Sequence, residues 1–210
     1  MVSKQNEELL TNQQAMLFEI YDLYKKFKKN EKISSKSTGK IKKIKPVMEY
    51  IVDTNYIDKV QEILLSYSSI WGFVHKSSIK QWITRPKTIH IIGIFNQKKK
   101  QEDSNHCNDL IGVMVYGEKP SYLKINYIAV DKKYKDISLG EHYISFLKDK
   151  CKELGSHKIY AEVPKSNENG LRFFIKNGFV IEGILKNHTK GNKDLVLMAK
   201  YIDGDVSKRR

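Results

Sequence analysis

The segment from Tyr127 to Leu154 constrains the fold most strongly, because its hydrophobic pattern changes period within a few residues. The apolar run that ends at Val130 is typical of a β-strand, and a polar, lysine-rich turn follows it. After Gly140 the apolar residues recur at helical spacing: they are Tyr143, Ile144, Leu147, Cys151 and Leu154. A strand, a short loop and a helix N-terminus gather unpaired backbone N–H groups, which suit an anionic phosphate. An ordinary βα turn has the same pattern.

The composition favours acidic partners. Lysine and arginine exceed aspartate and glutamate by 38 − 24 = 14 in 210 residues, and this length suffices for one α/β domain. Such an excess is typical of proteins that bind nucleic acid, a ribosome, an anionic membrane or a phosphorylated ligand. A lysine-rich surface that is merely solvated is the alternative.

Cysteine use and hydropathy indicate a protein of the cytoplasm. The two cysteines, Cys107 and Cys151, have neither the spacing nor the context of a disulfide framework or a metal site. The sequence contains no signal-type apolar block and no apolar run of membrane-spanning length. We therefore expect cytoplasmic localisation, no bound metal and no membrane contact.

The N-terminal part of the chain predicts an amphipathic helix over residues 6–29, followed by a lysine-rich segment. Ten lysines and one acid lie between Lys25 and Lys45. This segment is either an electrostatic arm for nucleic acid or a ribosome, or a solvated linker. The linker is favoured, because no aromatic residue lies between the lysines after Phe27 to stack on bases. The apolar stripe of the helix must be buried on its own domain or in a homodimer.

Three regions are expected: residues 1–45 with the helix and linker, a compact domain over residues 46–203, and a basic tail over residues 204–210. Within the domain, the predicted strands are 47–52, 88–95, 110–116, 125–130, 158–163, 179–185 and 195–202. One helix is predicted to begin at Thr54 or Asn55, a second to span 77–83, a third to follow Gly140, and a fourth to span 170–176. A polar hairpin loop is predicted over residues 96–109. This order predicts a mixed sheet with a right-handed βαβ crossover.

Two motifs lie in this predicted domain. Residues 130–140 have the sequence V-D-K-K-Y-K-D-I-S-L-G, and residues 167–179 have the sequence N-E-N-G-L-R-F-F-I-K-N-G-F. The first is similar to the cofactor loop of the GNAT superfamily of N-acetyltransferases, in which Arg/Gln-x-x-Gly-x-Gly/Ala follows an aromatic residue. Lys135 takes the Arg/Gln place, Ser138 that of the first glycine, and Gly140 keeps the second. The second motif resembles the family's Asn-x-x-Ala-x-x-x-Tyr-x-Lys-x-Gly-Phe.

The resemblance covers roughly Pro46–Tyr201. It implies a GNAT-like α/β fold, with a mixed central β-sheet flanked by helices, to which the predicted N-terminal helix is an addition. It also implies acetyl-coenzyme A as co-substrate. The implied cofactor-binding residues are Ile128, Ala129, Val130, Lys135, Asp136, Ile137, Ser138, Leu139, Gly140, Asn167 and Phe174.

The physics of such a site can be stated for these residues. Backbone amides near Ile128 and Val130 would pair with pantetheine as with an added strand, and the loop N–H groups would hold the pyrophosphate. Ser138 suits the place of a glycine if its φ is negative. The carboxylate of Asp136 repels a pyrophosphate unless it points to solvent, and neighbouring lysines offset this repulsion.

Acetyl transfer needs a base for the amine and a proton for the leaving thiolate. Family members often supply the proton from the tyrosine of the second motif, but Phe174 stands there. Tyr127 and Tyr143 are candidate substitutes, and water can also protonate a thiolate whose thiol has a reference pKa of about 8.5. Losing a positioned acid costs on the order of a hundredfold in rate.

The resemblance also implies a base. Histone-type relatives carry it at the position of Lys124, which cannot serve. Relatives that acetylate ribosomal-protein N-termini use a glutamate in a Glu-Val-x-x-x-Asn context, which Glu162 to Asn167 matches. Glu162 is therefore the candidate catalytic residue, with a solvent-facing carboxylate as the alternative. His142, His188 and Asp194 are treated as surface residues.

We therefore expect an N-acetyltransferase that transfers acetyl from acetyl-coenzyme A to a primary amine of a protein, a peptide or a small molecule. A protein or peptide amine is favoured. An α-amine has a reference pKa near 8, against about 10.4 for lysine, so a weak base would serve an N-terminus more readily. The alternative is a non-catalytic module of the same fold that binds coenzyme A and docks on nucleic acid or a ribosome.

Overall fold

The computed structural model describes residues 2–29, 44–96, 110–134, 138–189 and 191–202, with the side chains of residues 12–27 in the first range. The chain divides into two compact units. The larger unit comprises Ile41–Ala161 and Lys200–Arg210, and the smaller comprises Met1–Lys40 and Glu162–Ala199. The predicted hairpin loop with His106 and Cys107 lies outside the described residues, as does most of the Lys25–Lys45 segment.

Seven strands form one mixed sheet in the order β1-β2-β3-β4-β5-β7-β6. They are β1 (Pro46–Tyr50), β2 (Ile89–Asn96), β3 (Leu110–Glu118), β4 (Tyr122–Val130), β5 (Lys158–Pro164), β6 (Val180–Leu185) and β7 (Leu195–Tyr201). Neighbouring strands from β1 to β4 are antiparallel, as are β6 and β7, whereas β4 and β5 run parallel. The parallel pair is joined by α5 (Leu139–Leu154), the helical crossover that a parallel connection requires.

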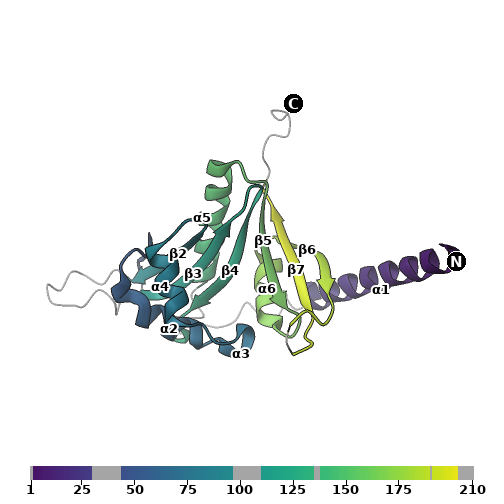
Figure 1. Ribbon diagram of the computed structural model, residues 1–210, viewed down its shortest axis with the longest axis horizontal. Coiled ribbons are helices and arrows are strands. Elements are labelled where there is room, and N and C mark those ends of the chain that lie inside the picture. Colours follow the sequence, from purple (N-terminus) through teal and green to yellow (C-terminus); the bar gives the residue numbers. More distant parts are fainter. Residues whose placement is uncertain (1, 30–43, 97–109, 135–137, 190, 203–210) are drawn as a thin grey trace. The chain divides into compact units, whose positions relative to one another are not determined.

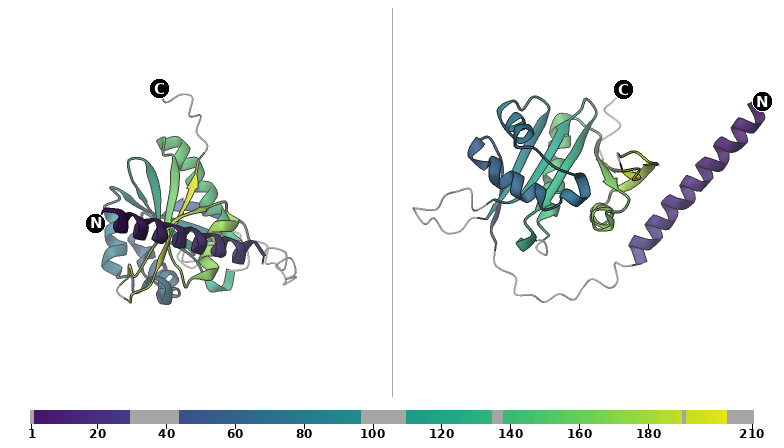
Figure 2. Two further views of the ribbon diagram at one scale, coloured as in Figure 1. Left: turned by 90° about the vertical axis from the view of Figure 1, so that its right-hand side faces the viewer. Right: turned by 60° about the horizontal axis from the view of Figure 1, so that its bottom comes forward.

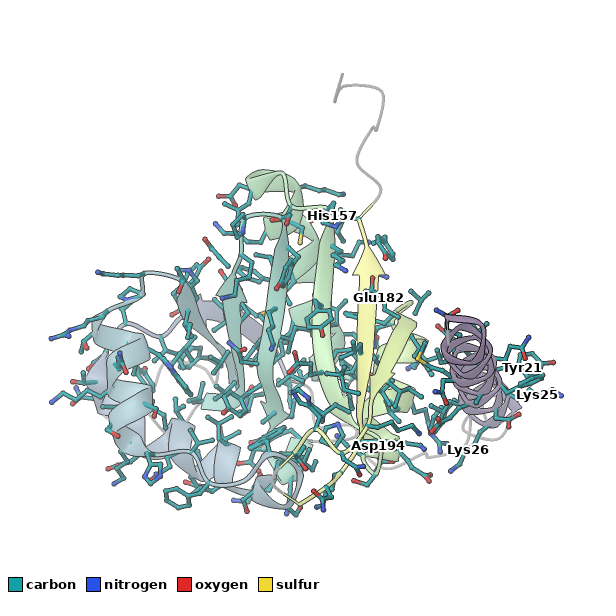
Figure 3. The ribbon with its side chains drawn as sticks, turned by 45° about the vertical axis from the view of Figure 1, so that its right-hand side comes forward. Tyr21, Lys25, Lys26, His157, Glu182 and Asp194 are labelled. Atoms are coloured by element: carbon teal, nitrogen blue, oxygen red, sulfur yellow. The ribbon has the colours of Figure 1, made fainter. Side chains whose placement is uncertain are left out.

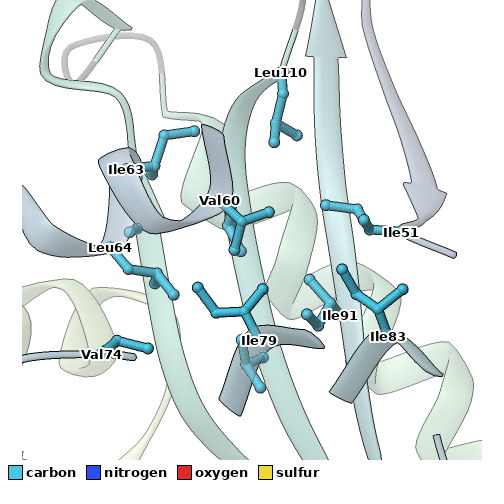
Figure 4. Close-up of a cluster of buried hydrophobic side chains, with 12 residues drawn as sticks. Ile51, Val60, Ile63, Leu64, Val74, Ile79, Ile83, Ile91 and Leu110 are labelled. Atoms are coloured by element: carbon cyan, nitrogen blue, oxygen red, sulfur yellow. The ribbon is translucent and has the colours of Figure 1, made fainter. Parts of the chain in front are cut away.

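In the larger unit, helices cover both faces of the strands (Figure 1). The helices α2 (Ile57–Leu65) and α4 (Lys76–Thr84) lie over one face of β2 to β4, and α5 lies over the other. Their apolar stripes pack on alternate strand residues, as the period of each element requires. Figure 4 shows the part of the core that involves α2 and α4, whose buried members include Val60, Ile63, Leu64, Ile79, Ile83, Ile91, Val113, Val115 and Ala129.

The turn into α2 differs in detail from the prediction. A 3₁₀ turn, Thr54–Tyr56, precedes the helix, and the side chain of Asp53 accepts a hydrogen bond from the Asn55 N–H at 2.8 Å. Asp53 thus caps the 3₁₀ turn, and α2 itself begins at Ile57, later than the predicted Thr54 or Asn55. The short helix α3 (Ser68–Trp71) was not predicted, because a single turn carries no periodicity that a sequence pattern could show.

The smaller unit contains α1 (Val2–Lys29), α6 (Glu168–Lys176), β6 and most of β7. Figure 2 shows α1 as one unbroken helix. Its C-terminal half packs against this unit: Phe27 is 2% exposed, and the Tyr24 hydroxyl accepts a 2.7 Å hydrogen bond from the Ile181 N–H. The helix therefore buries part of its apolar surface on its own chain. Leu17, Phe18 and Tyr21 are exposed. Homodimerisation stays a prediction.

The described residues contain neither a membrane-spanning helix nor a cluster of metal-ligating side chains. Among the described helices, none is long and apolar enough to cross a membrane. Within the same ranges, no three His, Cys, Asp or Glu side chains are grouped so that they could hold a metal ion. Cys151 is buried, which raises the pKa of its thiol to about 11 and leaves it a packing residue at neutral pH.

Candidate functional site

The first part of the candidate site is the C-terminal half of β4. Val115 of β3 pairs with Tyr127, but the next residue, Tyr116, pairs with Ile125, so Asn126 is an extra residue in β4. Such a β-bulge bends the strand and increases its twist. The described ladder between β4 and β5 comprises four pairs, from Tyr122 with Lys158 to Ile125 with Ala161. The bulge thus follows directly on the last of these pairs, and residues 126–130 continue β4 beyond it.

Side chains and backbone have different roles at this strand end. Ala129 is 2% exposed and packs in the core. The hydroxyl of Tyr67, which lies between α2 and α3, donates a 2.7 Å hydrogen bond to the Val130 carbonyl. Burial raises the pKa of Tyr67, so this hydroxyl stays protonated and keeps donating. Sequence reasoning missed Tyr67, because nothing in a local pattern connects residues 63 positions apart.

The loop after β4 is ordered by its own aspartate. Asp131 accepts from the Lys133 N–H with its side chain at 3.0 Å and from the Tyr134 N–H with its carbonyl at 2.8 Å. This Asx-type turn forms the short 3₁₀ helix Lys132–Tyr134. Lys59 of α2 lies 3.8 Å from the same carboxylate. Lys135, Asp136 and Ile137, all predicted to bind the cofactor, lie outside the described residues.

Ser138 begins α5 in a left-handed conformation, with φ 49° and ψ 23°. Ser138 was expected to suit the place of a glycine only with a negative φ, and that condition is not met. The family motif has glycine at this place, and glycine adopts positive φ without a Cβ clash. Serine adopts it at a cost of roughly 1–2 kcal/mol. Leu139 is 2% exposed and anchors the first turn of α5 in the core.

The second part of the site lies in the smaller unit. Along β5, Ile159, Ala161 and Val163 are buried while the residues between them are partly exposed, so Glu162 is on the partly exposed face. Asn167 caps α6, its side chain accepting from the Gly170 N–H at 3.1 Å. A methyl on Gly170, the alanine of the family motif, would come within 2.4 Å of the Asn167 Nδ2.

Phe174 is buried in an aromatic cluster. Its ring meets Phe179 edge to face at 4.8 Å and Phe173 at 5.2 Å, and it is 4% exposed. This packing accounts for a phenylalanine, because a tyrosine hydroxyl at the same place would need a hydrogen-bond partner. The side chain offers no proton to a leaving group.

The two tyrosines considered as substitute acids differ sharply. Tyr143 is fully buried, which raises its hydroxyl pKa well above the ordinary value. Its oxygen lies near the Ile94 backbone and close to Gly112, but among the described residues it has no partner of acceptable hydrogen-bond geometry. Tyr143 is therefore a core residue. Tyr127 is partly exposed between Trp71 and Trp82, and burial raises its pKa.

Other residues singled out in the sequence lie at the surface or in ion pairs. His142 is exposed and lines, with β1 residues such as Met48 and Tyr50, a depression of about 430 Å³ on the α5 side of the larger unit. No predicted site residue lines this depression. The Lys124 ammonium lies 5.8 Å from the Tyr160 ring centre. His188 is exposed.

The predicted site residues therefore fall in two sets. The larger unit holds Ile128, Ala129, Val130, Ser138, Leu139 and Gly140 at the end of β4 and the start of α5. The smaller unit holds Glu162, Asn167 and Phe174 at the end of β5 and on α6. The N-terminus of α5 presents backbone N–H donors, which fit a diphosphate, and Lys132 and Lys133 precede it in the sequence. The first-turn carboxylate of Glu141 acts against such a ligand.

Residues 57–179 match the Acetyltransferase (GNAT) family. Because this match spans more than half of the chain, the chain belongs to the GNAT acetyltransferase family, whose members use acetyl-coenzyme A. The resemblance inferred from the two motifs is confirmed. The coarser part of the functional prediction, an acetyltransferase of this family, is confirmed with it.

Solved structures share the fold at low sequence identity. The ribosomal-protein-S18-alanine N-acetyltransferase of Escherichia coli has 17% identity and a TM-score of 0.60, over 77% of this chain and 98% of that chain. Ard1 of Thermoplasma volcanium has 17% identity and a TM-score of 0.61, over 76% and 99%. Spermidine N-acetyltransferase of Vibrio cholerae, in complex with CoA and spermine, has 14% identity and a TM-score of 0.61, over 75% and 95%. These likenesses establish the GNAT-like fold.

The left-handed Ser138 gives a first prediction. Ser138→Val should lower the free energy of unfolding by about 2 kcal/mol, because a β-branched residue is strongly disfavoured at positive φ. Ser138→Gly should leave it unchanged or raise it by up to about 1 kcal/mol. Urea denaturation followed by circular dichroism measures both. A valine variant as stable as the wild type would contradict the left-handed conformation.

The hydroxyls of Tyr67 and Tyr143 give a second prediction. Tyr67→Phe should lower the free energy of unfolding by about 1 kcal/mol, because the Val130 carbonyl loses its donor. Tyr143→Phe should leave it unchanged or raise it, because a buried hydroxyl without a partner is removed. Thermal unfolding of the two variants side by side provides the measurement. Equal losses in both would mean that the Tyr143 hydroxyl is hydrogen-bonded.

Proposed function

We propose that the protein acetylates a primary amine of a protein or peptide, with an N-terminal amine preferred over a lysine. The observation that carries this proposal is the family match over residues 57–179, together with a partly exposed Glu162 on β5 in the Glu-Val-x-x-x-Asn context. When bound, acetyl-coenzyme A supplies the acetyl group as a thioester.

The residues proposed to hold acetyl-coenzyme A are those at the end of β4 and the start of α5. Backbone groups around Ile128 and Val130 would pair with the pantetheine amides, as an added strand would. The N–H groups at the start of α5, from Ser138 to Gly140, would hold the diphosphate.

Glu162 is proposed to take the proton from the attacking amine, directly or through one water. A new C–N bond forms as the C–S bond breaks, and the thiolate leaves. Because Phe174 cannot donate, the thiolate takes its proton from solvent or from Tyr127, whose raised pKa keeps its hydroxyl protonated at neutral pH. An acceptor with the lower pKa of an α-amine suits a weak base such as a carboxylate.

Charge favours a peptide over a polyamine as acceptor. The formal net charge of the chain is +14, and such an excess produces a positive potential that repels a polycation. A peptide with a single α-amine is repelled far less by this potential.

Replacing Glu162 tests the proposed base. Glu162→Gln should lower kcat/KM by about a hundredfold or more, because the amine loses its proton acceptor. The loss should shrink at high pH, where more of the amine is already neutral. The measurement is thiol release from acetyl-coenzyme A with a panel of peptide N-termini, lysine peptides and polyamines.

Glu182→Gln provides the matched control, since Glu182 is an exposed carboxylate on the strand β6. It should leave kcat/KM within about twofold of the wild type. Equal losses in both variants would remove Glu162 from the reaction. Release of thiol with polyamines but with no peptide would contradict the proposed acceptor.

A second candidate function is a weakly catalytic or non-catalytic module that binds coenzyme A and docks on nucleic acid or a ribosome. The buried, apolar Phe174 favours it, because the usual acid is absent. This function requires RNA binding that weakens steeply with salt and disappears on deleting residues 1–45. Fluorescence anisotropy of a labelled RNA at several salt concentrations distinguishes the two, since binding that does not respond to salt would eliminate the second.

A further inference from the structure

The helix α1 lies outside the family-matched segment, but specific contacts attach it to the smaller unit. Besides the hydrogen bond between Tyr24 and Ile181, the Lys26 ammonium pairs with the Glu168 carboxylate at 2.6 Å. The Arg172 guanidinium lies over the Phe27 ring at 5.7 Å. Two of these partners are on α6, the helix that Asn167 caps.

The strongest polar contact of α1 is made by Glu19. Its carboxylate accepts from the Lys165 ammonium and from the Lys186 ammonium, the latter at 2.6 and 2.9 Å. Both lysines also lie near Asp194, at 3.6 Å for Lys165 and 3.4 Å for Lys186. The hydrogen bonds from Lys165 and then Lys186 lower the pKa of Glu19, so it is ionised at neutral pH. We name these four residues the Glu19 network.

The Glu19 network joins the turn that follows Glu162, the proposed base, to the loop between β6 and β7. Lys165 follows Glu162 by three residues, in the turn between β5 and α6. Lys186 and Asp194 flank the loop between β6 and β7, and Figure 3 shows Asp194 at the N-terminal end of β7. The Lys165 N–H donates to the Asp194 carbonyl at 3.0 Å, which ties the two segments together.

The charges of the Glu19 network cancel, because two carboxylates face two ammonium groups. Without Glu19 the same group carries one net positive charge. The Lys165 and Lys186 side chains are 36% and 55% exposed, so they remain accessible to a charge on an approaching acceptor. We propose that Glu19 determines acceptor preference, by neutralising Lys165 and Lys186 so that acidic acceptor peptides gain no advantage over neutral ones.

The inference rests on the proposed function and is tested with two peptides. They differ at the second residue, glutamate in one and glutamine in the other. Glu19→Gln should raise the ratio of kcat/KM for the acidic over the neutral peptide by about fivefold, the effect of one unit charge at several ångströms in a partly exposed site. High salt should reduce this change. An unchanged ratio overturns the proposal.

Three further variants separate charge from packing. Asp22→Asn makes the same charge change on an exposed position of the same helix, and Tyr24→Phe removes a docking contact without changing charge. Both should leave the ratio as in the wild type. Lys186→Gln should lower it. If Asp22→Asn or Tyr24→Phe raises the ratio as much as Glu19→Gln, the Glu19 network is not the cause and the proposal fails.

Failure of the proposed function is distinguishable from failure of this inference. A wild-type protein that acetylates neither peptide contradicts the proposed function. Equilibrium binding of the two labelled peptides, measured by anisotropy with coenzyme A present, then decides the role of Glu19. A preference for the acidic peptide that appears in Glu19→Gln supports it, and equal preferences in wild type and variant overturn it.

Discussion

The extra residue in β4 lies where the described pairing between β4 and β5 ends. Adjacent strands pair residue by residue, so a single inserted residue shifts every later side chain to the other face and bends the strand. In this chain the insertion at Asn126 comes directly after the last described pair between β4 and β5. Before the insertion, the alternation of β4 matches its pairing in the sheet. After the insertion, the alternation places Ala129 in the core. The strand end proposed to bind acetyl-coenzyme A is thus set apart by backbone geometry.

Much of this fold could be predicted from the sequence, because its elements are long and strongly periodic. The change of period after Val130 located α5, and the alternation over residues 158–163 located β5 with Glu162 on the partly exposed face. Local signals also located the end of α6: residues 177 and 178 form the turn after it, and Gly178 has a φ of 80°. These features depend on neighbours in sequence, and sequence patterns report such neighbours well.

The features that could not be predicted depend on distant residues or on backbone angles. Tyr67 holds the Val130 carbonyl across 63 positions, and Glu19 meets Lys165 and Lys186 across 146 and 167. The presence of a serine at position 138 does not predict the φ of that residue. The connection between the loop and α5 sets this φ at 49°. Comparison with the second motif identified Phe174 as a departure from the family. Only the packing of Phe173 and Phe179 around it explains why an apolar ring is tolerated there.

The hydrogen bond between Tyr24 and Ile181 has a consequence for solubility. The strand β6 is last in the strand order, and an edge strand offers its unpaired N–H and C=O groups to any other extended chain. A side-chain hydroxyl from α1 occupies one of those donors, and the helix that carries it is too bulky for a second strand to replace it easily. The helix α1, which lies outside the family motifs, can in this way prevent another extended chain from pairing with the edge of the sheet.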